Sequence, residues 1–120
     1  AGDYVEAMWK ILQHNRPDDW VIATGETHSV KEFVEEAFNY VDLNHEEYVQ
    51  TSEKFFRPNE VEYLLGDPKK AKEELGWEPK VKFNDLVKMM VDHDIIEAKK
   101  ELTLLKEGLI SPTWENPVNP

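Results

Sequence analysis

Only two short stretches of this chain have the composition of a β-strand, and their scarcity limits the folds that the chain can adopt. The first is WVIATG at residues 20–25, a continuous apolar run rich in β-branched residues, and the second is VEYLLG at residues 61–66. Each ends in a glycine that suits a turn. Because so few short strands cannot make a free-standing sheet, helices must supply most of the core. We therefore expect an α/β chain, a mixed α+β fragment that is mostly helical with two or three short strands.

A helix after Ser29 is the clearest element of the sequence. Ser29 can accept a hydrogen bond from the first turn while Glu32 reaches back to complete a capping box. Apolar residues then recur at helical spacing. A first helix is predicted in the same way from Asp3 to about Asn15, with Asp3 as its N-cap and Glu6 as the capping partner.

The segment DPKKAKEELGW predicts a short helix between two helix-bounding signals. Asp67 can cap this helix, and Pro68 suits its first position because that position needs no backbone N–H donor. Gly76 suits a left-handed stop after the last turn. We expect Trp77, which follows at once, to pack back onto the helix.

A long amphipathic helix is predicted from Asn84 or Asp85 to about Lys100. The side chains expected along one side of it are Leu86, Val87, Met90, Val91 and Ile95. Beyond this helix the sequence is rich in proline and has little periodicity, so its end is expected to be extended or disordered. We predict a single domain at residues 1–111 and a flexible tail at residues 112–120.

Composition and charge exclude several classes of protein. The 120 residues fit one domain or a piece of a larger protein, and the start on a helical pattern without a Met makes us expect a piece. A net charge of −11 argues against nucleic acid or an anionic membrane as the main partner. The chain has no cysteine, no signal-like segment and no apolar run of membrane-spanning length, so we expect a soluble protein of the cytoplasm.

Motifs for metal, hydrolytic and phosphate-loop chemistry are incomplete in this chain. HEEYV at residues 45–49 has Val49 where the zinc-protease helix needs its second His. VDHD at residues 91–94 is expected to lie on a solvated helix surface. The chain contains neither a Gly-x-Ser-x-Gly turn nor a glycine-rich phosphate loop. We therefore predict no metal site and no catalytic residue here.

The stretch FFRPNE carries the strongest candidate for ligand binding. Arg57 offers a planar fork of donors that suits a diphosphate or a carboxylate, and Pro58 stiffens the backbone beside it. Glu60 could accept hydrogen bonds from sugar hydroxyls. The alternative is that Arg57 pairs with a neighbouring acid, Glu53, Glu60 or Glu62, and has no further role.

Three segments carry a family resemblance. The chain contains, in this order, AGDYVEAMWKILQ, DDWVIATGETHSVKEFVEEAF and FFRPNEVEYLLGDPKKAKEELGWEPKVKFNDLVKMMV. Together they resemble the C-terminal part of the GDP-mannose 4,6-dehydratases, a family of extended short-chain dehydrogenase/reductases. The resemblance covers about residues 1–98, and RPNEVEYLLGDPKKAKEELGW is its most specific segment.

The resemblance implies that this chain is the smaller, C-terminal substrate-binding domain of an NADP-dependent lyase. Such an enzyme oxidises C4 of GDP-mannose, eliminates water across C5 and C6, and returns the hydride to give GDP-4-keto-6-deoxymannose on the route to GDP-fucose. In the family's RPxE segment the arginine binds the diphosphate and the glutamate binds a hydroxyl, which implies these roles for Arg57 and Glu60. NADP and the Rossmann domain that holds it would belong to a missing part, the partner of this chain.

Two departures from the family pattern limit what the chain can do alone. The glycine-rich cofactor turn is absent, and no Tyr is followed four residues later by Lys, as the family's catalytic pair requires. We therefore expect the isolated chain to be inactive and to hold no cofactor. Its uncovered apolar face invites self-association as a homo-oligomer. The alternatives are a non-enzymatic protein-interaction module that retains the fold, and a metal-binding or hydrolytic domain that no spacing favours.

Overall fold

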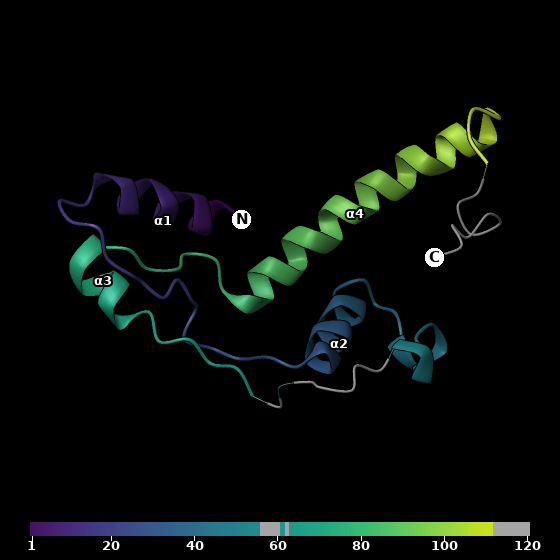
Figure 1. Cartoon of the computed structure of the whole chain (residues 1–120). Helices are drawn as coiled ribbons and strands as arrows, with labels where there is room; N and C mark the ends of the chain where they lie inside the picture. Colours follow the sequence, from purple (N-terminus) through teal and green to yellow (C-terminus); the bar gives the residue numbers. More distant parts are fainter. Residues whose placement is uncertain (56–60, 62, 112–120) are drawn as a thin grey trace.

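The structure is a computed structural model that describes residues 1–55, 61 and 63–111. Its helices and 3-10 turns, in chain order, are α1 (Gly2–Gln13), α2 (Val30–Tyr40), η1 (His45–Glu47), η2 (Glu53–Phe55), α3 (Lys69–Leu75) and α4 (Phe83–Lys106). Figure 1 shows that α1 lies against α3 at one end of the molecule, while α2 lies along the first half of the long helix α4. The two helix pairs are joined by extended chain.

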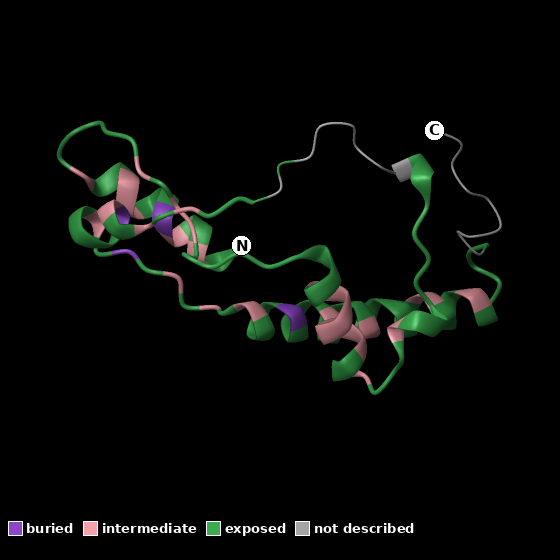
Figure 2. Cartoon of the chain, turned by 90° about the horizontal axis from the view of Figure 1, so that it is seen from below, coloured by how far each residue is buried: buried purple, intermediate pink, exposed green. Residues whose placement is uncertain are grey.

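The arrangement of the helices is open. The Cα radius of gyration is 19.3 Å, whereas a compact domain of this length would have about 14 Å. Among the described residues, the hydrophobic side chains that are buried are Ala7, Ala71, Trp77 and Val87. Figure 2 shows how few residues are buried and how much of the chain is exposed. Most of the large apolar side chains among the described residues are therefore exposed or only partly covered.

The predicted strands do not form in the part of the chain that the structure describes. Residues 20–25, 61 and 63–66 have no regular secondary structure, so the expected mixed α+β fragment is wrong in this respect. The two runs approach each other, since a Cβ placed on Gly66 would lie 2.4 Å from the Cβ of Ala23. No backbone hydrogen bond between described residues joins them. A β-strand requires a series of backbone hydrogen bonds to a neighbouring strand, and a strand-like composition alone does not provide that neighbour.

The capping box at the start of α2 is confirmed. The backbone N–H of Glu32 donates to Ser29 Oγ at 3.1 Å, and the N–H of Ser29 donates to Glu32 Oε2 at 2.6 Å. The helix is tied to α4 by Tyr40, whose hydroxyl donates to the carboxylate of Asp92 at 3.0 Å. The first turn of α2 therefore forms with the capping box that Ser29 and Glu32 predict.

The predicted cap of α1 is wrong. This helix begins at Gly2, follows Ala1 without a side-chain cap, and ends at Gln13. The carboxylate of Asp3 instead accepts hydrogen bonds from backbone N–H groups near residue 80, and Glu6 forms an ion pair with Lys80. Both carboxylates therefore bind residues 80–81, which are distant in the sequence, and do not cap the first turn of α1.

The short helix α3 follows two of its predicted signals, Asp67 and Gly76, but Pro68 lies just before the helix as its N-cap residue and not at its first position as predicted. Asp67 Oδ1 accepts from the N–H of Lys69 at 2.9 Å, and Gly76 ends the helix with φ of 60°, a left-handed conformation that glycine adopts without strain. Trp77 then turns back and is 1% exposed. Its position next to α1 places the chain that follows it, residues 78–81, beside the first turn of α1.

The long helix α4 differs from the prediction in its length and in which of its side chains are buried. It begins at Phe83, one or two residues early, and runs to Lys106, six residues beyond the predicted end. Val87 is buried as expected, but Leu86 and Met90 are 40% and 44% exposed, so the predicted apolar side is partly wrong. The second half of α4 extends past α2 (Figure 1). The apolar side that helical spacing predicts is therefore covered only in part by the described chain.

Candidate functional site

The two predicted ligand-binding residues, Arg57 and Glu60, lie outside the described residues. The described chain reaches the end of η2 at Phe55 and is described again at Val61 and from Tyr63 onward. Their binding roles therefore stay predictions.

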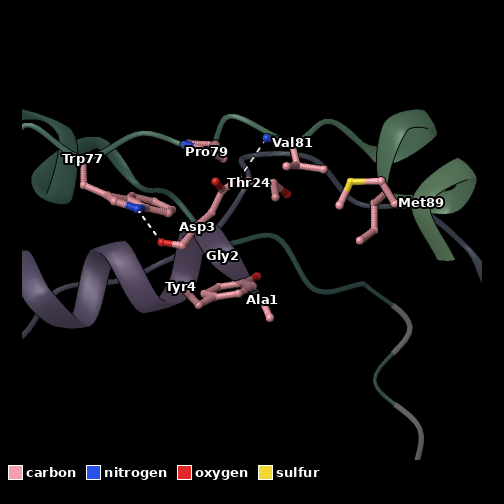
Figure 3. Close-up of a pocket in the computed structure, with 10 residues that line it drawn as sticks. Ala1, Gly2, Asp3, Tyr4, Thr24, Trp77, Pro79, Val81 and Met89 are labelled. Carbon is pink, nitrogen blue, oxygen red and sulfur yellow. Dashed lines mark hydrogen bonds between the residues drawn. The ribbon is translucent and has the colours of Figure 1, made fainter. Parts of the chain in front are cut away.

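An apolar pocket of about 170 Å³ lies where α1, the segment after α3 and the first half of α4 meet. Among the residues that line it are Tyr4, Thr24, Trp77, Pro79, Leu86 and Met89. Figure 3 shows Tyr4, Thr24, Trp77, Pro79 and Met89 around the hollow, with Asp3 at its edge. The lining can receive an apolar group, since it offers aromatic and aliphatic surface with few polar atoms.

Asp3 fixes the shape of this pocket. Its carboxylate accepts hydrogen bonds from the backbone N–H groups of Lys80 at 2.9 Å and Val81 at 3.0 Å, and its backbone carbonyl accepts one from the indole N–H of Trp77 at 2.8 Å (Figure 3). The N–H of Val81 is the main cause that lowers the pKa of the Asp3 carboxyl, and the N–H and charge of Lys80 act in the same direction. A carboxylate that already accepts two N–H groups suits positioning rather than proton abstraction.

Acid is expected to weaken this contact, because the pKa of Asp3 is lowered from its ordinary value of 3.8 in the folded chain. A carboxyl whose pKa is lowered by folding stabilises the folded chain at a pH above its pKa in the unfolded chain. This stabilisation is lost as the pH falls through its pKa in the folded chain. We expect the environment of Trp77 to change below about pH 4, measured by fluorescence against pH. The Asp3→Asn variant should lack that contribution and show a flatter profile. Identical profiles in the two proteins would contradict this role of Asp3.

The other polar residues of α1 also bind the chain that follows α3. Lys10 Nζ donates to the backbone carbonyl of Gly76 at 2.6 Å, and Glu6 pairs with both Lys10 and Lys80. The hydrogen bond from Lys80 is the main cause that lowers the pKa of the Glu6 carboxyl. The charged side of α1 is therefore half-buried and contacts the rest of the molecule.

A polar cluster joins the start of α2 to the start of α4. The imidazole of His28 stacks on the ring of Phe83, with centroids 3.8 Å apart and planes 10° apart. Its two ring nitrogens lie 3.6 Å from the carboxylate of Glu26 and 3.9 Å from that of Glu32. Lys82 Nζ lies 3.4 Å from Glu26 and is the main cause that lowers the pKa of that carboxyl. These contacts orient the two helices. Sequence reasoning missed the contacts made by Lys82 and Phe83 because these residues are far in the chain from Glu26 and His28.

The remaining histidine and acid motifs do not assemble into a site. His45–Glu47 is a single 3-10 turn, and His93 is exposed on α4 as predicted. Among the described residues, no group of three or more His, Asp or Glu side chains is placed to hold a metal ion. In the same part of the chain, no helix has both the length and the apolar character needed to cross a membrane.

Comparison with known protein families shows which family the chain matches. A sequence model of the family described as GDP-mannose 4,6 dehydratase matches residues 1–90, three quarters of the chain. This chain belongs to the GDP-mannose 4,6 dehydratase family. The family resemblance predicted from the three segments is therefore confirmed. The match includes α1, the pocket-lining residues up to Met89, and the stretch that contains Arg57 and Glu60.

Individual dehydratases match most of the chain. GDP-mannose 4,6 dehydratase 1 of Arabidopsis thaliana is 56% identical over 108 residues, which cover 90% of this chain and 30% of the relative. The human GDP-mannose 4,6 dehydratase is 45% identical over 112 residues, covering 79% of this chain and 30% of the relative. That of Yersinia enterocolitica is 35% identical over 144 residues, covering 97% and 39%. The chain thus spans about a third of the length of the curated relatives it matches.

Proposed function

We propose that this chain is the GDP-mannose-binding part of a GDP-mannose 4,6-dehydratase, the lyase that forms GDP-4-keto-6-deoxymannose on the route to GDP-fucose. The observation that carries the proposal is the family match over residues 1–90, which includes the RPNE segment. The position of the chain in the C-terminal part of the parent enzyme, and its location in the cytoplasm, stay predictions.

Arg57 and Glu60 are the residues proposed to contact the substrate. The guanidinium of Arg57 would bind the diphosphate of GDP-mannose through paired, charge-assisted hydrogen bonds. Glu60, three residues later, would accept hydrogen bonds from hydroxyl groups of the nucleotide sugar. These two residues bind and orient the substrate, and neither is assigned a catalytic step.

The residues of this chain do not fit NADP. The glycines at positions 76 and 108 end α3 and α4 with positive φ, and the glycines at 2, 25 and 66 are isolated, so none forms a glycine-rich phosphate turn. We therefore assign NADP and the catalytic residues to the portion of the dehydratase that this chain does not match, and call that portion the cofactor-binding part. Without that part the isolated chain would be inactive.

The nucleotide site is tested by replacing Arg57 with alanine. Titration of GDP-mannose at low salt, followed by amide NMR, should shift signals of residues 55–61 in the wild type. In Arg57→Ala the affinity should fall at least about tenfold, which corresponds to about 1.4 kcal/mol. Arg16→Ala is the matched control, because Arg16 is exposed and also precedes a proline. Arg16→Ala should bind as the wild type does.

The same titration separates the proposal from its alternative. Equal binding by the wild type and Arg57→Ala would show that Arg57 is not the diphosphate ligand. If the wild type at millimolar GDP-mannose gave no response in either the presence or the absence of the cofactor-binding part, the non-enzymatic interaction module would be the better description.

A further inference from the structure

The polar side of α1 is the side that faces the rest of the chain. Asp3, Glu6 and Lys10 all make contacts with the segment at residues 76–81. Ala7, which is 1% exposed, is buried against the same unit. An amphipathic helix of a free-standing domain has the reverse orientation, with its charges toward water.

The opposite side of α1 is apolar and exposed. We call it the outward stripe, and its residues are Tyr4, Val5, Met8, Trp9 and Leu12. Their exposed fractions run from 48% for Tyr4 to 80% for Leu12. At about 100° per residue these positions fall within an arc of about 140°, and no charged residue lies among them. The outward stripe therefore has the pattern of a buried helix face without any part of the described chain to bury it.

The outward stripe continues into the apolar pocket. Tyr4 belongs to both, and Met89 lies across the pocket from it (Figure 3). The lining residues Leu86 and Met89 are 40% and 59% exposed. Together they make an apolar surface with a hollow wide enough for a large side chain. Such a contiguous surface marks an interaction site in a soluble protein.

We infer that the outward stripe and the adjoining pocket are the docking surface for the cofactor-binding part of the dehydratase. The inference rests on the proposed function, because it takes the unmatched length of the relatives as the partner. That length is 70% of the Arabidopsis relative and of the human relative, whose matched shares are 30% each. A stripe without charges has the composition of a permanent interface rather than of a transient one.

A second copy of this chain is a poorer occupant of the same surface. Each copy carries a net charge of −11, so two copies would meet with like charge around the apolar stripe. Repulsion of this kind keeps strongly charged proteins apart. A partner with a less negative net charge would not be repelled in this way.

The test uses the full chain and a partner whose folding can be checked. The partner is the Arabidopsis relative without the segment that this chain matches, and its binding of NADP shows that it is folded. Sedimentation velocity measures its complex with this chain in the absence of GDP-mannose. The wild type should bind, and Met8→Glu combined with Trp9→Glu should bind on the order of 100-fold more weakly, because unpaired carboxylates would be buried.

The variants are chosen to leave the isolated chain folded. Met8 and Trp9 are 62% and 61% exposed, so their replacement should disturb the internal packing little, which circular dichroism will verify. Val30→Glu is the matched control, since Val30 is an apolar residue of α2 that is 82% exposed and lies outside the stripe. It should bind as the wild type does.

Three results would overturn the docking surface. The first is equal binding by the wild type and the stripe variant, and the second is no binding of the wild type to the folded partner. The third is a homodimer of this chain that is lost in the stripe variant, which would make a second copy the occupant. Because no nucleotide sugar is present, the result is independent of Arg57, and failure of the nucleotide site would be visible separately.

Discussion

Replacement of Trp77 by alanine is expected to destabilise the unit formed by α1 and α3 by about 3 to 5 kcal/mol, the usual cost of removing a buried large aromatic side chain. Trp77 is 1% exposed and packs with Ala7 and Ala71, while Trp20 and Leu75 lie against the same cluster. Its indole N–H also donates to a backbone carbonyl of α1 at 2.8 Å. The variant loses the packing and leaves that carbonyl without its donor.

The effect of Trp77→Ala should be large relative to the stability of the chain. Small domains are stable by about 5 to 15 kcal/mol in total, so a loss of about 3 to 5 kcal/mol is a large share of the stability of such a chain. Urea unfolding followed by circular dichroism measures the change. Trp9→Ala is the matched control, because the same residue type is 61% exposed there and should change stability little. Similar losses in the two variants would show that Trp77 is not the centre of this unit.

Replacement of Gly66 by alanine is expected to destabilise the contact between the two extended runs by about 1 to 3 kcal/mol, the range for overpacking. A Cβ at this position would lie 2.4 Å from the Cβ of Ala23 and 3.3 Å from Cγ1 of Val21. Neither neighbour at these distances is the end of a long flexible side chain. The two backbone segments must therefore separate to admit the new methyl group.

Gly2→Ala is the matched control for Gly66→Ala. Gly2 is the first residue of α1, and a Cβ built there meets nothing within 4 Å. The same chemical change should be neutral or stabilising by up to about 1 kcal/mol, since alanine favours a helix more than glycine does. Thermal unfolding of both variants measures the pair. A Gly66→Ala protein as stable as Gly2→Ala would contradict the close approach of Gly66 and Ala23.

Features fixed by neighbouring residues could be predicted from the sequence. The capping box of Ser29 and Glu32 forms as expected, because both partners lie within one helical turn. Gly76 stops α3 in the left-handed conformation for the same local reason. The last turns of α4 were missed because helical propensity continues past Lys100 after the apolar periodicity weakens.

Features that depend on distant partners could not be predicted in this way. Asp3 has the local pattern of an N-cap, but the N–H groups of Lys80 and Val81 bind its carboxylate. The run at residues 20–25 has the composition of a strand, but no described segment supplies a hydrogen-bonding edge for it. For the candidate site, the sequence predicts a role for Arg57 and the resemblance implies an uncovered apolar face, but neither locates that face on α1, because helical periodicity does not reveal which side of α1 contacts the rest of the chain.

The central claim, that this chain supplies one part of a dehydratase, is tested most directly by reconstitution. Consumption of GDP-mannose would be measured with NADP for the chain alone, for the cofactor-binding part of the Arabidopsis relative alone, and for their mixture. We expect turnover in the mixture and none in either component, with the mixture made from Arg57→Ala much less active at the same substrate concentration. A mixture no more active than the folded, NADP-binding component alone would contradict the claim.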